Sequence, residues 1–178
     1  MEAPDEELML AYRDGDAGAF ETLYARHRGA LYRFVLRSLK GTASDRSIAE
    51  EMFQEAWIRV IEARGRYAPS ARFKTWLYTI AHNLIVDHWR RKGLTLVELD
   101  DEHAGPDNPA RQVEARQSAA RFLQALEALP PAQREAFLLH EEGGMSVAEI
   151  AVATGSNEEA AKSRLRYAMA KLKAAVDE

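Results

Sequence analysis

Three side chains in one short stretch could bind a metal ion, namely His82, Asp87 and His88. The stretch has helical spacing, and each residue of a helix turns by about 100°. On such a helix His82 lies roughly 120° from His88 and roughly 140° from Asp87. Zinc sites on helices use residues one turn apart, so these three side chains diverge. We therefore predict no metal site here.

The sequence also lacks the short motifs that mark common catalytic sites. It has no glycine-rich phosphate loop, no nucleophile motif and no clustered pair of carboxylates. It contains no cysteine, which excludes disulfides and thiolate metal sites and fits a reducing interior. We therefore expect no catalytic residue, no cofactor and no enzymatic activity.

The same stretch, "RFKTWLYTIAHNLIVDHWRRK" at residues 72–92, offers a different chemistry, the binding of nucleic acid. On a helical wheel Trp76 lies at the edge of a polar stripe with Thr79 and Asn83. An indole beside hydroxyl and amide groups can stack on an unpaired base while cations hold the phosphate backbone. The nearby cations are Arg72, Lys74, Arg90, Arg91 and Lys92. A half-buried Trp76 that belongs to the core is the alternative.

The remaining residues of this stretch divide between a core face and a polar face. Thr75 and Asp87 fall on the polar side of the wheel. The core arc consists of Phe73, Leu77, Tyr78, Ile80, Ala81, Leu84, Ile85 and Trp89. Most aromatic residues of the stretch are therefore expected to be structural.

Positive charge is concentrated in two parts of a chain whose formal net charge is −4. Residues 59–92 contain 8 basic and 2 acidic residues. Residues 160–176 contain five basic residues and no acidic one. This pattern indicates two contacts with a polyanion, and a solvated basic helix end is the alternative for each.

The second basic part overlaps "SVAEIAVATGSNEEAAKSRLRYAMAKLK", which has the layout of a helix-turn-helix. Ser146 and Glu149 form a capping box, Gly155 supplies the turn, and Asn157 can cap the second helix. The inward stripe of that helix is Ala161, Leu165, Ala168 and Leu172.

The first turns of the second helix carry donors that point away from this stripe. They are Lys162, Ser163 and Arg166, placed as in a recognition helix that reaches base edges and phosphates. Glu158 and Glu159 repel phosphate, and an ordinary α-hairpin with a basic face is the alternative.

Helical spacing recurs along the chain, and no strand-like alternation of any length is present. Asp16 is expected to cap a long helix, and Ser47 with Glu50 is expected to form a capping box. The expected helices cover about 5–14, 16–41, 47–64, 72–92, 111–128, 132–142, 146–154 and 157–176. Residues 94–110 are acidic and interrupted by Gly105 and two prolines, as in a linker. We predict an all-α protein with two small helical domains, 1–93 and 111–178, joined by this flexible acidic linker.

The expected helix at about 48–63 has an acidic outer stripe. Its members are Glu51, Gln54, Glu55, Ile58 and Glu62, and the inward residues are Ala49, Met52, Phe53, Ala56, Trp57, Val60 and Ile61. Acidic stripes are usually solvated, but an apolar Ile58 in the middle favours a protein partner with a basic, partly apolar surface.

No apolar run is long enough to span a membrane, and the first residues, "MEAPDEELML", are acidic where a signal peptide is basic. We therefore expect a cytoplasmic protein with no membrane insertion.

These features together resemble an extracytoplasmic-function (ECF) sigma factor of the sigma-70 family. The matching segments are "GDAGAFETLYARHRGALYRFVLR", "AEEMFQEAWIRV", "FKTWLYTIAHNLIVDHWRRK", "LPPAQREAFLLHEEGGMSVAEIA" and "AAKSRLRYAMAKLK". They cover nearly the whole chain outside the linker. The resemblance implies a factor that directs core RNA polymerase to promoters, with a sigma-2 domain at 1–93 and a sigma-4 domain at 111–178.

The resemblance also implies site residues and partners. The stripe Glu51, Gln54, Glu55 and Ile58 would meet the clamp helices of the largest polymerase subunit, and sigma-4 would meet the flap. The −10 element, with its melted non-template strand, would be bound by Ser70, Arg72, Lys74, Trp76, Thr79, Asn83, Arg90 and Arg91. The −35 duplex would be read by Lys162, Ser163, Arg164 and Arg166. An anti-sigma factor is a further partner that the family implies.

Two other classes of protein compete with this interpretation. A two-component response regulator shares the "PAQREAFLL…EIA" pattern, but it needs a receiver domain with alternating strands and helices, which residues 1–93 do not show. A helical adaptor that binds only protein would not depend on Lys162 and Arg166 for binding to DNA.

Overall fold

The computed structural model describes residues 1–39, 43–93 and 115–177. These residues form helices joined by short turns, with no strand among them, which confirms the predicted all-α class. The predicted linker at 94–110 lies outside the described residues.

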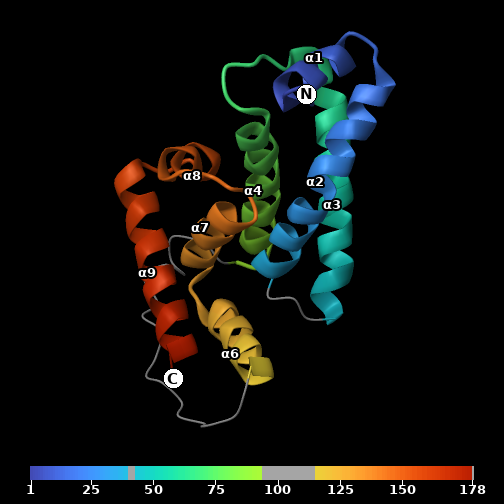
Figure 1. Ribbon diagram of the computed structural model, residues 1–178. Helices are drawn as coiled ribbons and strands as arrows, with labels where there is room; N and C mark the ends of the chain where they lie inside the picture. Colours follow the sequence, from blue (N-terminus) through green and yellow to red (C-terminus); the bar gives the residue numbers. More distant parts are fainter. Residues whose placement is uncertain (40–42, 94–114, 178) are drawn as a thin grey trace.

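The helices form two groups along the chain (Figure 1). The N-terminal bundle consists of α1 (Asp5–Arg13), α2 (Ala17–Ser38), α3 (Ala43–Ala63), a 3-10 turn (Arg64–Arg66) and α4 (Phe73–Arg91). The C-terminal bundle consists of α6 (Ala115–Ala128), α7 (Pro131–Glu141), α8 (Val147–Thr154) and α9 (Glu158–Asp177).

Several helix ends lie where the sequence predicts them. The Asp16 carboxylate accepts hydrogen bonds from the amides of Gly18 and Ala19, at 3.0 and 3.3 Å. Asn157 caps α9 by accepting a 2.8 Å bond from the Ala160 amide. Gly155 ends α8 with φ of 64°, a left-handed conformation that favours glycine.

Two predicted helix boundaries are wrong. Helix α3 begins at Ala43, so Ser47 lies inside the helix and does not cap it. Asp45 lies in the first turn, where a negative side chain is favoured by the helix dipole. Helix α2 ends at Ser38, a few residues before the predicted Gly41.

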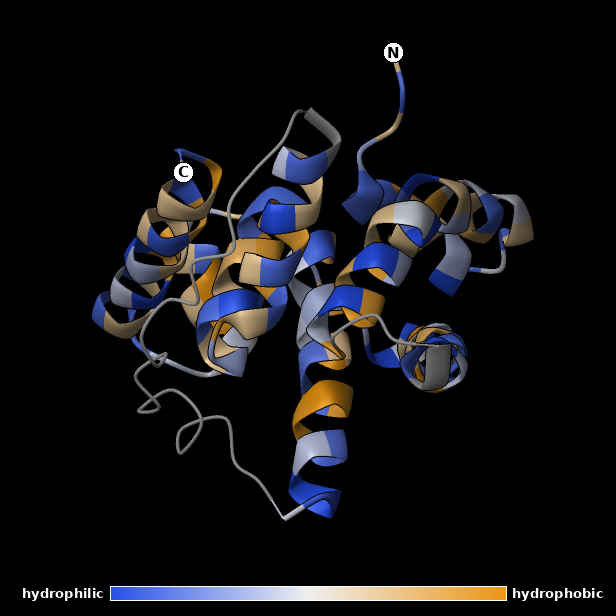
Figure 2. Cartoon of the chain, turned by 90° about the horizontal axis from the view of Figure 1, so that it is seen from below, coloured by the Kyte–Doolittle hydropathy of each residue, from blue (hydrophilic) through white to orange (hydrophobic). Residues whose placement is uncertain are grey.

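The core of the N-terminal bundle is apolar and rich in aromatic residues, and Figure 2 shows hydrophobic stretches alternating with hydrophilic ones along the helices. The Phe34 and Tyr78 rings meet edge to face with centroids 5.2 Å apart. Trp57 packs against Tyr24 at 5.1 Å and Phe20 at 5.8 Å. These contacts join α2, α3 and α4 into one unit.

The faces of two helices differ from the prediction in part. Ile61 was expected inside but is 40% exposed on α3. Thr75 was expected on the polar face of α4 but is 4% exposed. Thr75 lies two turns before His82 on the same face of α4, and His82 contacts Glu135 of the C-terminal bundle. The bundle covers this face, which a helical wheel of α4 alone does not show.

The two bundles pack against each other along two pairs of helices, α4 with α8 and α2 with α7 (Figure 1). Arg134, the fourth residue of α7, is 1% exposed and points into this contact. Its guanidinium donates to the carbonyls of Ser38 at 3.1 Å and Leu129 at 3.0 Å. Burial lowers the pKa of Arg134 to about 10. This cation therefore links the end of α2 to the start of α7.

The turn between α7 and α8 brings glycine backbone close to α4. Gly144 has φ of 60°, and a Cβ built on it would lie 3.1 Å from the Lys74 ammonium nitrogen. At Gly143, an added Cβ would lie 2.5 Å from the Leu139 carbonyl oxygen. Gly144 therefore lies where this turn approaches α4, whereas Gly143 lies where the chain folds back closely on α7.

Candidate nucleic-acid interface

One face of α4 carries most of the residues predicted to bind the −10 element. Asn83 is exposed, while Trp76 and Thr79 are half-buried. The Trp76 ring packs against Tyr67 at 5.2 Å and Phe73 at 5.9 Å. Trp76 therefore packs among aromatic rings, as the core alternative predicts, and it remains partly accessible, as stacking on a base requires.

The loop before α4 presents Ser70 and Arg72 to solvent. Tyr67 anchors its beginning and is 4% exposed. Burial, with the negative charges of Glu6 and Asp5, raises the pKa of Tyr67 to about 12. Arg72 pairs with Glu149 of α8 at 3.1 Å, although its own side chain remains 64% exposed.

The basic end of α4 is open to solvent. Arg90 and Arg91 are both exposed, and Arg90 lies 3.6 Å from the Asp87 carboxylate. The Lys92 ammonium lies 5.7 Å from the centroid of the Trp89 ring. Lys74, at the other end of the helix, is half-buried beside Gly144.

A second face of α4 meets the C-terminal bundle through His82. Its ring is 8% exposed and its Nδ1 atom lies 2.5 Å from the Glu135 carboxylate. Burial lowers the pKa of His82, but the charge and hydrogen bond of Glu135 raise it by more, against a smaller opposing effect of Arg164. The pKa of His82 is therefore above its ordinary value in this arrangement.

The helix-turn-helix prediction fits α8 and α9. Ser146 accepts a 3.2 Å bond from the Glu149 amide, but Glu149 does not complete the predicted capping box, because its carboxylate pairs with Arg72. The predicted inward stripe of α9 is buried, namely Ala161, Leu165, Ala168 and Leu172.

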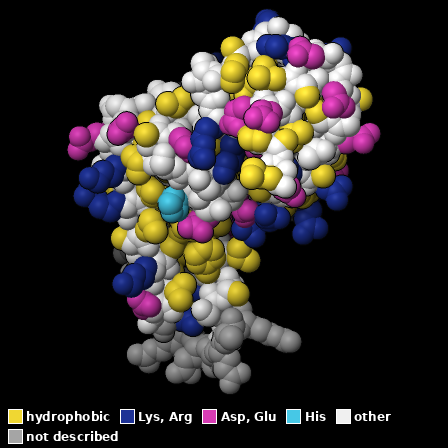
Figure 3. Space-filling model, turned by 45° about the horizontal axis from the view of Figure 1, so that its top comes forward, with side chains coloured by type: hydrophobic (Ala, Val, Ile, Leu, Met, Phe, Trp, Pro, Cys, Tyr) yellow, Lys and Arg dark blue, Asp and Glu magenta, His cyan; other side chains and the backbone are white. Residues whose placement is uncertain are grey.

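Two of the four predicted −35 residues lie on the outer side of α9, whereas Arg164 is close enough to His82 at the bundle contact to act on its pKa. Lys162 and Arg166 are exposed, and Ser163 and Arg164 are half-buried. Figure 3 shows Lys and Arg side chains along the edge of the molecule where α8 and α9 lie. The Arg166 guanidinium lies 5.3 Å from the centroid of the Tyr167 ring, which restricts its side chain at the surface.

The acidic stripe of α3 also faces outward. Glu51 and Gln54 are exposed, and Ile58 is 46% exposed. Glu55 is half-buried and pairs with Arg59 at 3.1 Å. A groove of about 470 Å³ runs beside the stripe between α3 and α4. The groove has a charged rim, and Ile48, Met52 and Leu84 supply apolar lining.

Within the described ranges, no group of three or more His, Asp or Glu side chains is arranged to hold a metal ion. His82 turns toward Glu135, whereas the Nε2 atom of His88 is buried with no hydrogen-bond partner. The same residues include no helix with both the length and the apolar character needed to cross a membrane.

Comparison with known protein families identifies both bundles. The family model "Sigma-70 region 2" matches residues 23–95, and "Sigma-70, region 4" matches residues 119–172. The chain belongs to the sigma-70 family.

Its relatives are ECF sigma factors, and the chain is one of them. It is 34% identical to RNA polymerase sigma factor CarQ of Myxococcus xanthus over 93% of each chain. It is 33% identical to ECF RNA polymerase sigma factor SigM of Mycobacterium tuberculosis, over 96% of this chain and 84% of SigM. The function of this sigma factor is therefore transcription initiation, in which promoters are recognised through regions 2 and 4.

Solved structures share the arrangement of both bundles. CnrH, solved in complex with the cytosolic domain of CnrY, aligns over 97% of both chains with a TM-score of 0.69 and 27% identity. RpoE of Bartonella quintana, solved with the anti-sigma factor NepR, has the same fold at 22% identity, with a TM-score of 0.66 over 89% of this chain and 96% of RpoE.

Sequence reasoning missed the residues that join the two bundles. Glu142 accepts from Arg33 at 2.9 Å and from Arg37 at 3.0 Å. Glu135 and Glu149 also pair across the contact. The partners lie between 53 and 109 residues apart in the chain, so no local pattern could reveal them.

Proposed function

We propose that this sigma factor binds core RNA polymerase through α3 and its promoter through two separate faces, one on α4 and one on α9. Residues 1–93 act as sigma-2, 94–110 as the linker and 111–178 as sigma-4. The observation that carries the proposal is the exposure of Lys162 and Arg166 on the second helix of the helix-turn-helix, opposite its buried stripe.

The −35 duplex is read by Lys162, Ser163, Arg164 and Arg166. A recognition helix needs long donors in its first turns, and small alanines let it lie deep in the major groove. The packing of Arg166 on Tyr167 supports this role, because a restricted side chain loses less entropy when it binds.

The −10 element is bound along α4 and the loop before it. Trp76 supplies the stacking surface, Thr79 and Asn83 supply polar groups, and Ser70 lies in the exposed loop. The cations on this side hold phosphates of the melted non-template strand, namely Arg72, Lys74, Arg90 and Arg91. The accessible part of Trp76 makes an unpaired base a better ligand than closed duplex.

Core polymerase is held by the stripe of Glu51, Gln54, Glu55 and Ile58. Exposed carboxylates around an exposed isoleucine suit a basic partner with an apolar centre, which we assign to the clamp helices of the largest subunit. We assign the polymerase flap to sigma-4.

The packed arrangement of the two bundles cannot reach both promoter elements together. Their names place them about 25 base pairs apart, which is roughly 85 Å at 3.4 Å per base pair. A compact chain of this length has a radius of gyration of about 16 Å and a diameter of roughly 40 Å. We therefore expect sigma-2 and sigma-4 to separate when the promoter is bound.

We also propose that an anti-sigma factor is a partner of the packed arrangement. CnrH was solved with the cytosolic domain of CnrY, and it aligns with this chain over both bundles. We expect no catalytic activity of its own and a cytoplasmic location, where polymerase and promoter meet.

The test is binding of the reconstituted holoenzyme to promoter duplex at several salt concentrations. The double variant Lys162→Ala with Arg166→Ala should bind more weakly, and its salt dependence should be shallower by about 2 in log–log slope if each cation contacts one phosphate. Lys173→Ala, on an exposed position near the end of α9, is the control and should leave the slope unchanged. An unchanged slope in the double variant would show that Lys162 and Arg166 do not contact the promoter.

A further inference from the structure

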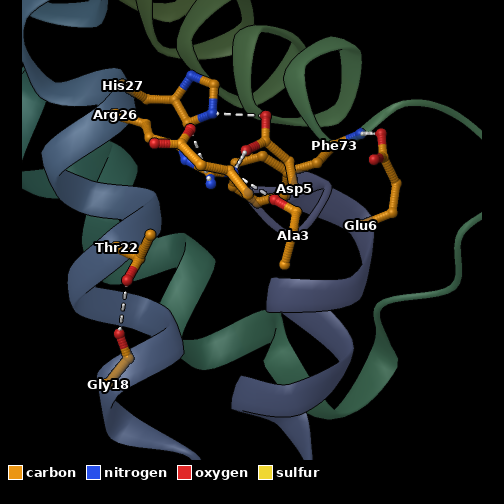
Figure 4. A network of polar contacts seen from close by, with 9 residues as sticks. Ala3, Asp5, Glu6, Gly18, Thr22, Arg26, His27 and Phe73 are labelled. Carbon is orange, nitrogen blue, oxygen red and sulfur yellow. Dashed lines mark hydrogen bonds and ion pairs between the residues drawn. The ribbon is translucent and has the colours of Figure 1, made fainter.

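The start of α4 is closed by a side chain from α1. The first amides of a helix have no partner within the helix, and a carboxylate placed there is also favoured by the helix dipole. Arg72, which precedes α4, gives no side-chain cap. The Phe73 amide instead donates to the Glu6 carboxylate at 2.9 Å (Figure 4). Glu6 therefore caps a helix that begins 67 residues later in the chain.

The position of Glu6 is fixed by its neighbour in the chain. Asp5 binds Arg26 at 3.0 Å and His27 at 2.8 Å through its two oxygens, and Arg26 also donates to the Ala3 carbonyl at 2.7 Å (Figure 4). These contacts dock the beginning of α1 on α2. Glu6 thus reaches α4 from a site held by a separate network.

Aromatic packing extends from this cap to the proposed −10 surface. The Phe73 ring lies 5.4 Å from His27 and 5.9 Å from Trp76. Tyr67, at the other end of the loop, contacts both Phe73 and Trp76. A displacement of the first turn of α4 would therefore be passed to Trp76 and to both ends of the loop.

We propose that Glu6 is a positioning residue for promoter melting. It fixes the first turn of α4, and through that turn it sets the orientation of Trp76 and of residues 68–72, without touching DNA itself. The inference rests on the proposed function, because it needs the α4 face to bind the melted strand.

A purely structural role for Glu6 predicts a different outcome. The docking of α1 depends on Asp5 and on buried residues such as Met9, which is 0% exposed. Removal of Glu6 should leave these contacts intact. Glu7 is exposed on the same turn of α1 and provides a matched control with the same charge.

The first measurement is amide hydrogen exchange on the full chain in three variants, Glu6→Ala, Glu6→Gln and Glu7→Ala. Loss of a helix cap should increase exchange at Phe73 and the following turn by roughly 3- to 30-fold in Glu6→Ala. Glu6→Gln keeps an acceptor oxygen and should restore most of the protection. Glu7→Ala should match the wild type, and wild-type exchange at Phe73 in Glu6→Ala would overturn the proposal.

The second measurement is opening of a promoter by holoenzyme at saturating core polymerase, followed by a fluorescent base in the −10 element. Glu6→Ala should lower the opened fraction several-fold while core affinity stays at the wild-type value, measured well below the thermal midpoint, which loss of one cap should lower by only a few degrees. Normal opening by Glu6→Ala despite faster exchange would overturn the proposal. Trp76→Ala distinguishes failure of this inference from failure of the proposed function. If Trp76→Ala also opens the promoter normally, the α4 face does not bind the melted strand, and the proposed function is the one that fails.

Discussion

The contacts inside sigma-2 and the contacts between sigma-2 and sigma-4 differ in chemistry. Helices α2, α3 and α4 join through aromatic and aliphatic side chains such as Phe34 and Tyr78. The two domains also share one continuous apolar core, but their contact adds charged groups, including Glu142 with Arg33 and Arg37. Apolar surface is costly to expose to water, whereas surface charges regain hydration when they separate. The domain contact is therefore the one that can be exchanged for polymerase and promoter.

Arg72 illustrates the exchange. It pairs with Glu149 in the packed arrangement, and we propose that it holds a phosphate of the −10 element. The Glu149 carboxylate therefore competes with DNA for this cation.

The largest expected effect comes from a change in the apolar core of sigma-2. Phe34→Ala should destabilise sigma-2 by about 3–5 kcal/mol, because Phe34 is fully buried and its loss leaves a cavity. Thermal or urea denaturation followed by circular dichroism measures the loss. Ile61→Ala, at a residue that is 40% exposed, is the control and should cost less than about 1 kcal/mol. Equal effects would mean that the aromatic core does not dominate sigma-2.

A smaller effect is expected from the buried cation of the domain contact. Arg134→Met leaves the carbonyls of Ser38 and Leu129 without this donor, which should cost about 1–3 kcal/mol. Denaturation measures the cost, and small-angle scattering should show a larger radius for the variant. Arg121→Met is the control, because Arg121 donates only to Gln117 of its own helix. An unaltered radius would show that Arg134 does not hold the domains together.

Charge reversal at Glu142 should open the contact with a free-energy change of about 1 kcal/mol, because both partner arginines are partly exposed. Fluorescence transfer between probes on α3 and α9 measures the separation. Arg33→Glu with Arg37→Glu should restore closure in the Glu142→Arg background. Glu141→Arg, whose wild-type side chain is 53% exposed, should leave the distance unchanged. Opening by both reversals would indicate a general charge effect.

The smallest expected effect is a pH dependence of closure through His82. Its pKa is raised in the packed arrangement, so the pair with Glu135 contributes fully below the ordinary pKa of about 6.5 and is lost as pH rises through the raised value. The charges that act on the ring are Glu135 and, in opposition, Arg164. The same fluorescence measurement should report opening at higher pH, and His82→Gln should flatten the profile. Opening toward lower pH would contradict this assignment.

Much of each domain could be predicted from local sequence patterns. The buried stripe of α9 and the caps at Asp16 and Asn157 depend on residues within one or two turns, which periodicity and capping rules describe. Ser146 was also predicted correctly as a cap.

Beyond the two helix boundaries and the face of Ile61, the remaining errors involve distant partners. Glu149 completes an ion pair with Arg72 instead of a capping box, and Thr75 is buried by a bundle that follows it in the chain. Glu6 caps a helix whose own sequence carries no capping side chain. Local propensity contains no information on such pairs, since they exist only after the chain has folded.

The Gly143–Gly144 turn restricts which residues the chain can carry between α7 and α8. At Gly144 a methyl group would meet the Lys74 ammonium and would also have to adopt a left-handed backbone. Because that ammonium ends a flexible side chain and can move aside, the cost of an alanine there lies in the backbone, and the turn that carries α8 toward α4 would be destabilised.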